Sequence, residues 1–421
     1  MSYRILLIYN KPEREVKRLQ RIEDELLNLR ADSVIQKLWW NDDSFLSKAI
    51  KFKPDAILTY PLSGRDLSVR IYIIKLFSGC LVTTYRTEGV YDDLFLVNPS
   101  NDRYGCTLLD LEFFWGNLEK TKVAEDLVRE KKLSSKDRII LTGFIELEEY
   151  LGKPSLFLEN YLDKEDIKTI ESKPKDKIIL IITGFHIADY TAEMFDEVKD
   201  MREEFRERFL NRIEAGKAFR ASYIAKIRES AKLYPDCLFV VKTHPLENRS
   251  TYDELSEFEN ILLLDLAFPM SCILEKVGLF VHYGSTASAD SYICGLPSIF
   301  VYSQKIENEF GVPFCEAPGM LSTLDVELDE LPEKIGYYTS GQLSFEVRDE
   351  NEALLYKAYN LERGKPYEPS KVIARFLLEK ERRQRLSVGD FYLWRSLLII
   401  TTRGIRRFFR KLFTKSGHSG T

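Results

Sequence analysis

Short apolar runs that alternate with helical stretches constrain the fold of this 421-residue chain more than any other feature. Each run has the length of a buried strand rather than of a buried helix. Parallel neighbours in a sheet need a crossover, usually a helix, so this alternation predicts α/β structure with parallel sheets. In the first half of the chain the runs are at residues 5–9, 33–38, 56–59, 81–84 and 139–142.

A second set of apolar runs follows a charged stretch at residues 151–177. The length of the chain also favours more than one domain. We therefore expect two Rossmann-like domains, 1–160 and 176–345, followed by helices at 346–390 that return across the cleft between them. The second set of runs is at residues 178–183, 238–242, 261–264, 279–281 and 298–302.

Two turns in the second half directly follow predicted strands and carry polar side chains. One reads Lys-Thr-His-Pro-Leu-Glu at 242–247, and the other reads Tyr-Gly-Ser-Thr at 283–286. Ligands of open α/β sheets bind outside the carboxyl ends of the strands, so the two turns are expected to share a pocket. His244, Ser285 and Thr286 offer donors for a phosphate, and Gly284 allows a close approach. The alternative is that one turn only ends a strand and the other only caps a helix.

Three further residues are candidates for the same donor pocket. Gly184 follows the first strand of the second domain, where a glycine allows close approach of a nucleotide or simply forms a turn. Glu247 is placed to accept hydrogen bonds from a ribose or to orient His244. Asp290 follows Thr286 by one helical turn and would lie on the same helix face.

Three short motifs, in this order, resemble those of bacterial GT-B glycosyltransferases that use CMP-activated sugars. They are Thr87-Glu88-Gly89, His244-Pro245 and Gly284-Ser285-Thr286. The enzymes in question are sialyltransferases, polysialyltransferases and Kdo-type transferases of surface polysaccharides. Residues 139–151 and 290–300 are similar to bacterial surface carbohydrate biosynthesis proteins of the same broad kind. The resemblance covers most of the chain.

The resemblance implies two Rossmann-like domains that face a cleft, the first for the acceptor and the second for the nucleotide donor. It also implies that Glu88 is the general base on the acceptor, although Thr87 stands where many of these enzymes carry another acid. His244 is the second predicted catalytic residue, because it would hold the leaving phosphate. Arg86 and Asp92 are candidates for binding the acceptor. Arg86 is also explained as an ordinary surface arginine and Glu88 as a solvated turn glutamate, and Asp92 is an alternative to Glu88 in the role of the base.

The final segment, 391–421, combines large apolar residues with a cluster of arginines and lysines. This composition predicts an amphipathic helix on an anionic membrane surface, where lipid-linked acceptors are found. The alternative is a helix packed on the body of the protein. Nucleic-acid binding is a poorer explanation, since the net charge is −5 and basic character is confined to this segment.

Composition also indicates the cellular compartment of the protein and whether it binds a metal or spans a membrane. The six cysteines form no CxxC pair and favour a reducing compartment. With four histidines and no paired ligand spacing, no metal site is expected, and the phosphate would be neutralised by side chains and helix N-termini. No apolar run is long enough for a signal peptide or a membrane span. We therefore expect a cytoplasmic bacterial protein, peripheral on the inner face of the membrane.

The leading hypothesis is a metal-independent glycosyltransferase without a cofactor. It would transfer a CMP-linked sugar of the sialic or Kdo type to a surface polysaccharide, in capsule or lipopolysaccharide, or to a lipid-linked acceptor. A UDP-sugar 2-epimerase of the same fold is the first alternative, and transfer of a polyol phosphate from a CDP-alcohol is the second. A non-enzymatic scaffold with a degenerate cleft is the remaining class, and absence of nucleotide binding would favour it.

Overall fold

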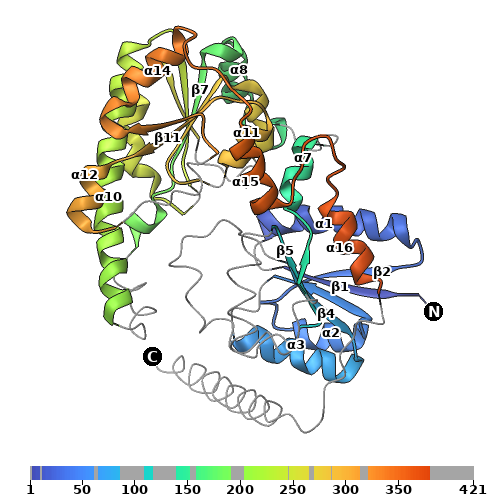
Figure 1. The fold of residues 1–421 in the computed structure, drawn as a ribbon. Helices are drawn as coiled ribbons and strands as arrows, with labels where there is room; N and C mark the ends of the chain where they lie inside the picture. Colours follow the sequence, from blue (N-terminus) through green and yellow to red (C-terminus); the bar gives the residue numbers. More distant parts are fainter. Residues whose placement is uncertain are drawn as a thin grey trace, which may run out of the picture.

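The chain folds into two α/β lobes, each built on a six-stranded parallel sheet (Figure 1). The computed structural model describes residues 2–9, 12–60, 65–85, 109–116, 139–151, 158–190, 203–244, 246–264, 270–285, 287–312 and 321–379. The predicted basic tail at 391–421 and the residues Arg86, Glu88, Asp92 and Thr286 lie outside these ranges.

The first sheet has the strand order β2-β1-β3-β4-β5-β6, so the chain reverses direction across the sheet between β1 and β3. Its strands are β1 (Arg4–Tyr9), β2 (Val34–Trp39), β3 (Ala56–Thr59), β4 (Leu81–Tyr85), β5 (Leu111–Phe114) and β6 (Ile139–Leu141). The helices of this lobe are α1 (Pro12–Leu29), α2 (Phe45–Phe52), α3 (Arg65–Ser78) and α7 (Glu148–Leu151). Strands β3, β4 and β5 are buried along their whole length, as expected where helices cover both faces of a sheet.

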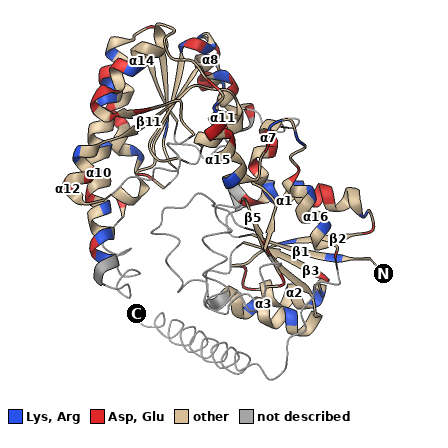
Figure 2. Cartoon of the chain, in the orientation of Figure 1, with Lys and Arg blue, Asp and Glu red and all other residues tan. Residues whose placement is uncertain are grey.

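The second sheet has the order β12-β11-β10-β7-β8-β9, so its reversal lies between β7 and β10. Its strands are β7 (Ile178–Ile182), β8 (Leu238–Lys242), β9 (Ile261–Leu264), β10 (Leu279–His282), β11 (Ser298–Tyr302) and β12 (Leu324–Glu327). Its helices are α8 (Lys164–Glu171), α10 (Glu203–Leu233), α11 (Ser288–Ile293), α12 (Gln304–Phe310) and α14 (Leu331–Thr339). Charged residues of both signs lie along α10 and α14, which contact each other, whereas the strands of this sheet carry few (Figure 2).

Ten of the twelve strands in the described ranges coincide with the predicted apolar runs, and β5 and β12 were not predicted. Strand β5 reads Leu-Glu-Phe-Phe and buries Glu112, a residue type that is seldom found inside. Strand β12 alternates apolar and acidic residues, Leu-Asp-Val-Glu, at the edge of its sheet. Neither sequence has the continuous apolar run that identified the other strands.

Two further helices, α15 (Asp349–Tyr359) and α16 (Pro369–Leu377), connect the end of the described chain to both lobes. Helix α16 lies against α1 (Figure 1), and the Tyr3 hydroxyl donates to the Leu377 carbonyl at 2.8 Å. Leu355 and Tyr359 of α15 share one apolar cluster with Trp115 of the first lobe and Tyr292 of the second. The two lobes are therefore joined by a common core.

Candidate functional site

Three turns meet at the carboxyl edge of the second sheet, beside the point where its strand order reverses. They follow β7, β8 and β10, which are neighbours in the sheet. The backbone N–H of His244, after β8, donates to Thr183 Oγ1, after β7, at 3.2 Å. The ring of Phe185 stacks on Tyr283, after β10, with 4.9 Å between centroids. The structure thus brings together the segments that carry the predicted residues Gly184, His244, Glu247, Gly284 and Ser285.

Glu247 belongs to the turn after β8 and connects it to the turn after β7. Its Oε2 accepts from Thr183 Oγ1 at 2.8 Å and from the Tyr252 hydroxyl, and its Oε1 accepts from the Phe185 N–H at 2.6 Å. Burial raises the pKa of Glu247, although these donors oppose the shift. The carboxylate is therefore occupied within the protein, and Thr183, one of its donors, also accepts from the His244 backbone N–H.

His244 is half-buried, and its ring state follows from its neighbours. The Leu246 N–H donates to Nδ1 at 3.2 Å, so the neutral ring carries its proton on Nε2 and is a donor there. The His186 ring stacks on it with 4.5 Å between centroids, which fixes its plane. Two residues earlier, burial lowers the pKa of Lys242 to about 8. An imidazole donor and a cationic side chain thus belong to the same turn.

The turn after β10 is held at its start by hydrogen bonds of His282 and has open space beside Gly284. His282 is fully buried, its Nε2 lies 2.7 Å from Ser322 Oγ, and burial lowers its pKa to about 3. The Ser285 N–H donates to His282 Nδ1 at 3.4 Å, and Ser285 Oγ accepts from the Ala287 N–H at 3.2 Å. Gly284 has a φ of +56° and no described atom within 4 Å of where a Cβ would stand. Its left-handed conformation and the space beside it leave room for a ligand.

Asp290, expected near the donor, lies at the contact between the lobes. Its carboxylate accepts from the hydroxyl of Tyr150 on α7 of the first lobe. Burial raises the pKa of Asp290 to about 7, and the nearby Glu146 adds to the shift. The helix α11 that carries it begins at Ser288, close to the predicted start at Ala287.

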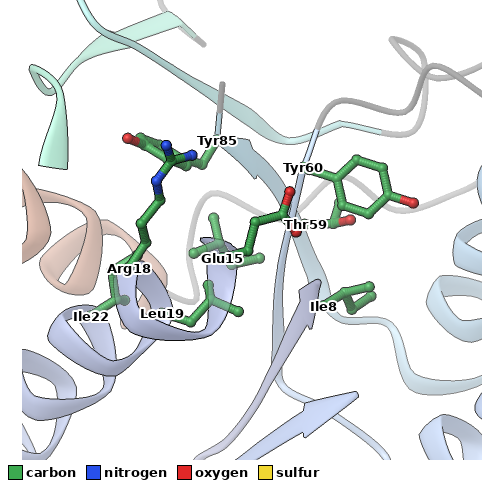
Figure 3. Close-up of a pocket in the computed structure, with 9 residues that line it drawn as sticks. Ile8, Glu15, Arg18, Leu19, Ile22, Thr59, Tyr60 and Tyr85 are labelled. Atoms are coloured by element: carbon green, nitrogen blue, oxygen red, sulfur yellow. The ribbon is translucent and has the colours of Figure 1, made fainter. Parts of the chain in front are cut away.

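The first lobe contains a pocket that the sequence analysis did not identify (Figure 3). It lies at the carboxyl ends of β1, β3 and β4, beside the reversal of the first sheet, and α1 forms its wall. Glu15 and Arg18 enter from α1, and Thr59, Tyr60 and Tyr85 enter from the strand ends. Their spacing in the sequence gave no signal, because each residue alone is typical of an ordinary helix surface or strand end.

Among the residues that the structure describes, no group of three His, Cys, Asp or Glu side chains is arranged to hold a metal ion. Within the same ranges, no helix combines the length and apolar character needed to cross a bilayer.

No protein-family model and no curated protein matches this sequence. Solved structures are similar in fold. The UDP-GlcNAc 2-epimerase from Neisseria meningitidis bound to UDP-GlcNAc is 15% identical, with a TM-score of 0.54 over 89% of this chain and 100% of that one. A putative UDP-N-acetylglucosamine 2-epimerase from Listeria monocytogenes is 12% identical, with a TM-score of 0.51 over 92% and 100%. The wall teichoic acid polymerase TagF is 12% identical, with a TM-score of 0.54 over 92% and 90%.

These similarities define the class of fold. Together with the two parallel sheets, they confirm the predicted α/β architecture of two Rossmann-like domains of the GT-B type. At this level of identity the similarity concerns the fold, and the chemistry must be argued from the site.

Proposed function

We propose that this protein is a metal-independent glycosyltransferase that takes a sugar from a nucleotide donor and works in the biosynthesis of bacterial surface glycans. The observation that supports the proposal most is the meeting of the turns after β7, β8 and β10 at the reversal of the second sheet. That position is the usual nucleotide site of a doubly wound sheet.

The donor phosphate would lie against the turns that carry His244 and Ser285. His244 Nε2–H donates to a phosphate oxygen, Lys242 adds positive charge, and the space beside Gly284 admits the phosphate. The hydroxyl hydrogen of Ser285 is a further donor, because its oxygen is what accepts from Ala287. Stabilising the negative charge that develops on the leaving phosphate is the main requirement of such a transfer.

The motifs support a particular donor sugar and particular catalytic and acceptor-binding residues. The resemblance of the Thr87-Glu88-Gly89, His244-Pro245 and Gly284-Ser285-Thr286 segments to CMP-sugar enzymes favours a CMP-linked sialic or Kdo-type acid as the donor. Glu88 would take the proton from the attacking acceptor hydroxyl as the anomeric carbon bond to the phosphate breaks. Arg86 and Asp92 would orient the acceptor.

Two other reactions fit the same fold. A UDP-sugar 2-epimerase is favoured by the solved epimerase bound to UDP-GlcNAc. Transfer of a polyol phosphate from a CDP-alcohol is favoured by the solved TagF variant with CDPG, which is 11% identical with a TM-score of 0.53 over 91% of this chain and 90% of that one. The epimerase would bind a uridine nucleotide, whereas both transferases would release CMP. The base therefore distinguishes the epimerase from the transferases, and the intact donor distinguishes the two transferases.

Thermal unfolding in the presence of CMP, CDP, UDP and GDP tests the proposal. A ligand at one hundred times its Kd stabilises the folded state by about 2.7 kcal/mol. We expect the largest shift with CMP or CDP, its loss in His244→Ala, and its retention in Leu246→Ala, a control at an exposed neighbour. A preference for UDP would favour the epimerase, and no shift with any nucleotide would contradict all three reactions. Turnover of CDP-glycerol rather than of a CMP-linked sugar would favour the polyol-phosphate transferase.

The proposal includes a peripheral location on the cytoplasmic face of the membrane, through the basic segment 391–421. Co-sedimentation with phosphatidylglycerol vesicles tests this part. We expect binding that weakens with salt and with replacement of Arg406, Arg407 and Arg410 by alanine. Equal binding to phosphatidylcholine vesicles would contradict it.

A further inference from the structure

Two histidine rings stack on each other at the carboxyl edge of the second sheet. His186 follows β7 and His244 follows β8, and their ring centroids are 4.5 Å apart with 26° between the ring planes. Both residues are half-buried. Only His244 was predicted from the sequence as a donor-site residue. A phosphate bound at His244 would therefore lie close to a second imidazole as well.

Hydrogen bonds on both sides of His186 hold its segment against the turn of His244. Before it, Thr183 Oγ1 accepts from the His244 N–H at 3.2 Å. After it, the carboxylate of Asp189 accepts from the Asn248 N–H at 2.7 Å. The segment between these two points, which includes the 3-10 turn His186–Asp189, also packs on α10. The fold itself thus places the two rings together.

The two rings differ in their capacity to accept a proton. The Leu246 N–H donates to His244 Nδ1 at 3.2 Å. A proton added to Nδ1 would put two donors face to face, and the turn would lose this hydrogen bond. His244 therefore stays neutral and donates from Nε2. Two adjacent imidazolium rings would also repel each other, so His186 is the ring of the pair that becomes positively charged.

Other charged and titratable groups surround the pair, on the elements packed against it. Burial lowers the pKa of Lys242 to about 8 and raises the pKa of Glu247, so an experiment on pH dependence must separate both from His186. Among the described residues the groups are Asp189 and Tyr190 beside His186, Arg220 on α10, which pairs with Asp189 at 2.7 Å, Lys242 on β8, and Glu247 and Tyr252 after it.

The phosphate of a CMP-linked sugar gains negative charge in the proposed reaction. As a diester it carries one charge, whereas the CMP that leaves is a monoester, which loses a second proton with a pKa of about 6. A cation beside the phosphate stabilises the second charge as it develops. An anion, in turn, favours the protonated form of a neighbouring histidine.

We propose that His186 takes up a proton from solvent when the phosphate monoester of CMP is bound, and so supplies positive charge to the donor site. His244 remains the neutral hydrogen-bond donor of the pair. The proton returns to solvent when CMP leaves. This inference rests on the proposed function, because it takes the turns after β7, β8 and β10 as the nucleotide site.

Isothermal titration calorimetry of the full chain with CMP, in two buffers of different ionisation enthalpy, measures the proton uptake. An imidazole of ordinary proton affinity is about one-tenth protonated at pH 7.5. A tenfold gain in proton affinity on binding makes it about half protonated, which is an uptake of about 0.4 proton per CMP. By linkage, the Kd of CMP should rise about fivefold from pH 6.5 to pH 8.5.

His186→Phe keeps a ring in the stack without a titratable nitrogen, and His186→Gln is a second variant with the same loss. Each should bind CMP about as tightly as the wild type at pH 8.5 and about fivefold more weakly at pH 6.5. Each should also lose about 0.4 proton of the uptake at pH 7.5, because the contributions of Lys242 and Glu247 stay in place. His418→Ala, a histidine outside the described ranges, is the control and should match the wild type.

Equal proton uptake and equal pH dependence in the wild type and both His186 variants would overturn the inference and leave the proposed function intact. Nitrogen-15 spectra of the imidazole rings give a readout that needs no nucleotide. The chain has four histidines, so single substitutions assign each ring. In the free protein we expect His186 to titrate near neutral pH and His244 to keep its Nε2–H form, and the reverse would also overturn the inference. Failure of the wild type to bind CMP would refute the proposed function, whereas these spectra would still decide which ring accepts the proton.

Discussion

Replacing Asp290 by asparagine should change the pH dependence of stability, because this residue joins the two lobes through Tyr150. Burial raises the pKa of the Asp290 carboxyl to about 7 from an ordinary value of 3.8. Between these values the folded state binds a proton that the unfolded state lacks. Stability therefore falls as the pH rises from about 4 to 7 and is level above that.

The size of the effect follows from the shift. One pKa unit corresponds to about 1.36 kcal/mol, so a shift of about three units gives a ceiling of about 4 kcal/mol above pH 7. Asp290 keeps some exposure to solvent, which screens part of this cost, and we expect about 2 to 3 kcal/mol. Asparagine reproduces the uncharged form and its amide oxygen still accepts from Tyr150, so the variant should be more stable than the wild type at pH 8.

Urea denaturation at pH 5 and pH 8, followed by circular dichroism, measures the change. The advantage of Asp290→Asn should be clearly larger at pH 8 than at pH 5, and the exposed control Asp253→Asn should show no such difference. If Asp290→Asn is less stable than the wild type at pH 8, or follows the same pH profile, the assignment of a buried, protonated carboxyl at the lobe contact is refuted.

Two further changes test other parts of the account. Glu247→Gln replaces one of the two carboxylate oxygens that accept from Thr183 and Phe185 by a donor. It should lower the free energy of unfolding in urea by about 1 to 3 kcal/mol and weaken nucleotide binding, and unchanged binding would show that Glu247 does not support the site. Gly116→Ala would place a Cβ 2.3 Å from the Lys357 carbonyl oxygen of α15 and should lower the melting temperature sharply. Among the described residues, a Cβ at Gly216 in α10 would meet Ala188 alone, at 3.5 Å or more, so Gly216→Ala should be neutral or stabilising. Equal behaviour of the two glycine variants would contradict the close contact of α15.

The sequence predicted the fold well because most strands are buried on both faces and are therefore continuously apolar. Strand β5 was missed for the physical reason that Glu112 interrupts it, and β12 because an edge strand alternates. The turns with His244 and Ser285 were predictable, since the carboxyl ends of parallel strands meet at one edge whatever the tertiary detail.

Roles that depend on distant partners could not be predicted. The contact of Asp290 with Tyr150 spans both lobes, and no local pattern encodes it. The donors on Glu247 come from the turn after β7 and from Tyr252, so its contacts are set only after folding. Glu15 lies in a highly charged helix whose sequence is typical of a solvated surface, and only the packing of α1 on the first sheet buries it.

A crystal structure of the protein with CMP bound tests the central claim most directly. We expect the phosphate of CMP to lie at the carboxyl edge of the second sheet, with His244 Nε2 and the Gly284-Ser285 turn about 3 Å from the phosphate oxygens. A nucleotide bound in the pocket of Glu15 and Thr59, or on a surface that touches none of the turns after β7, β8 and β10, would contradict it.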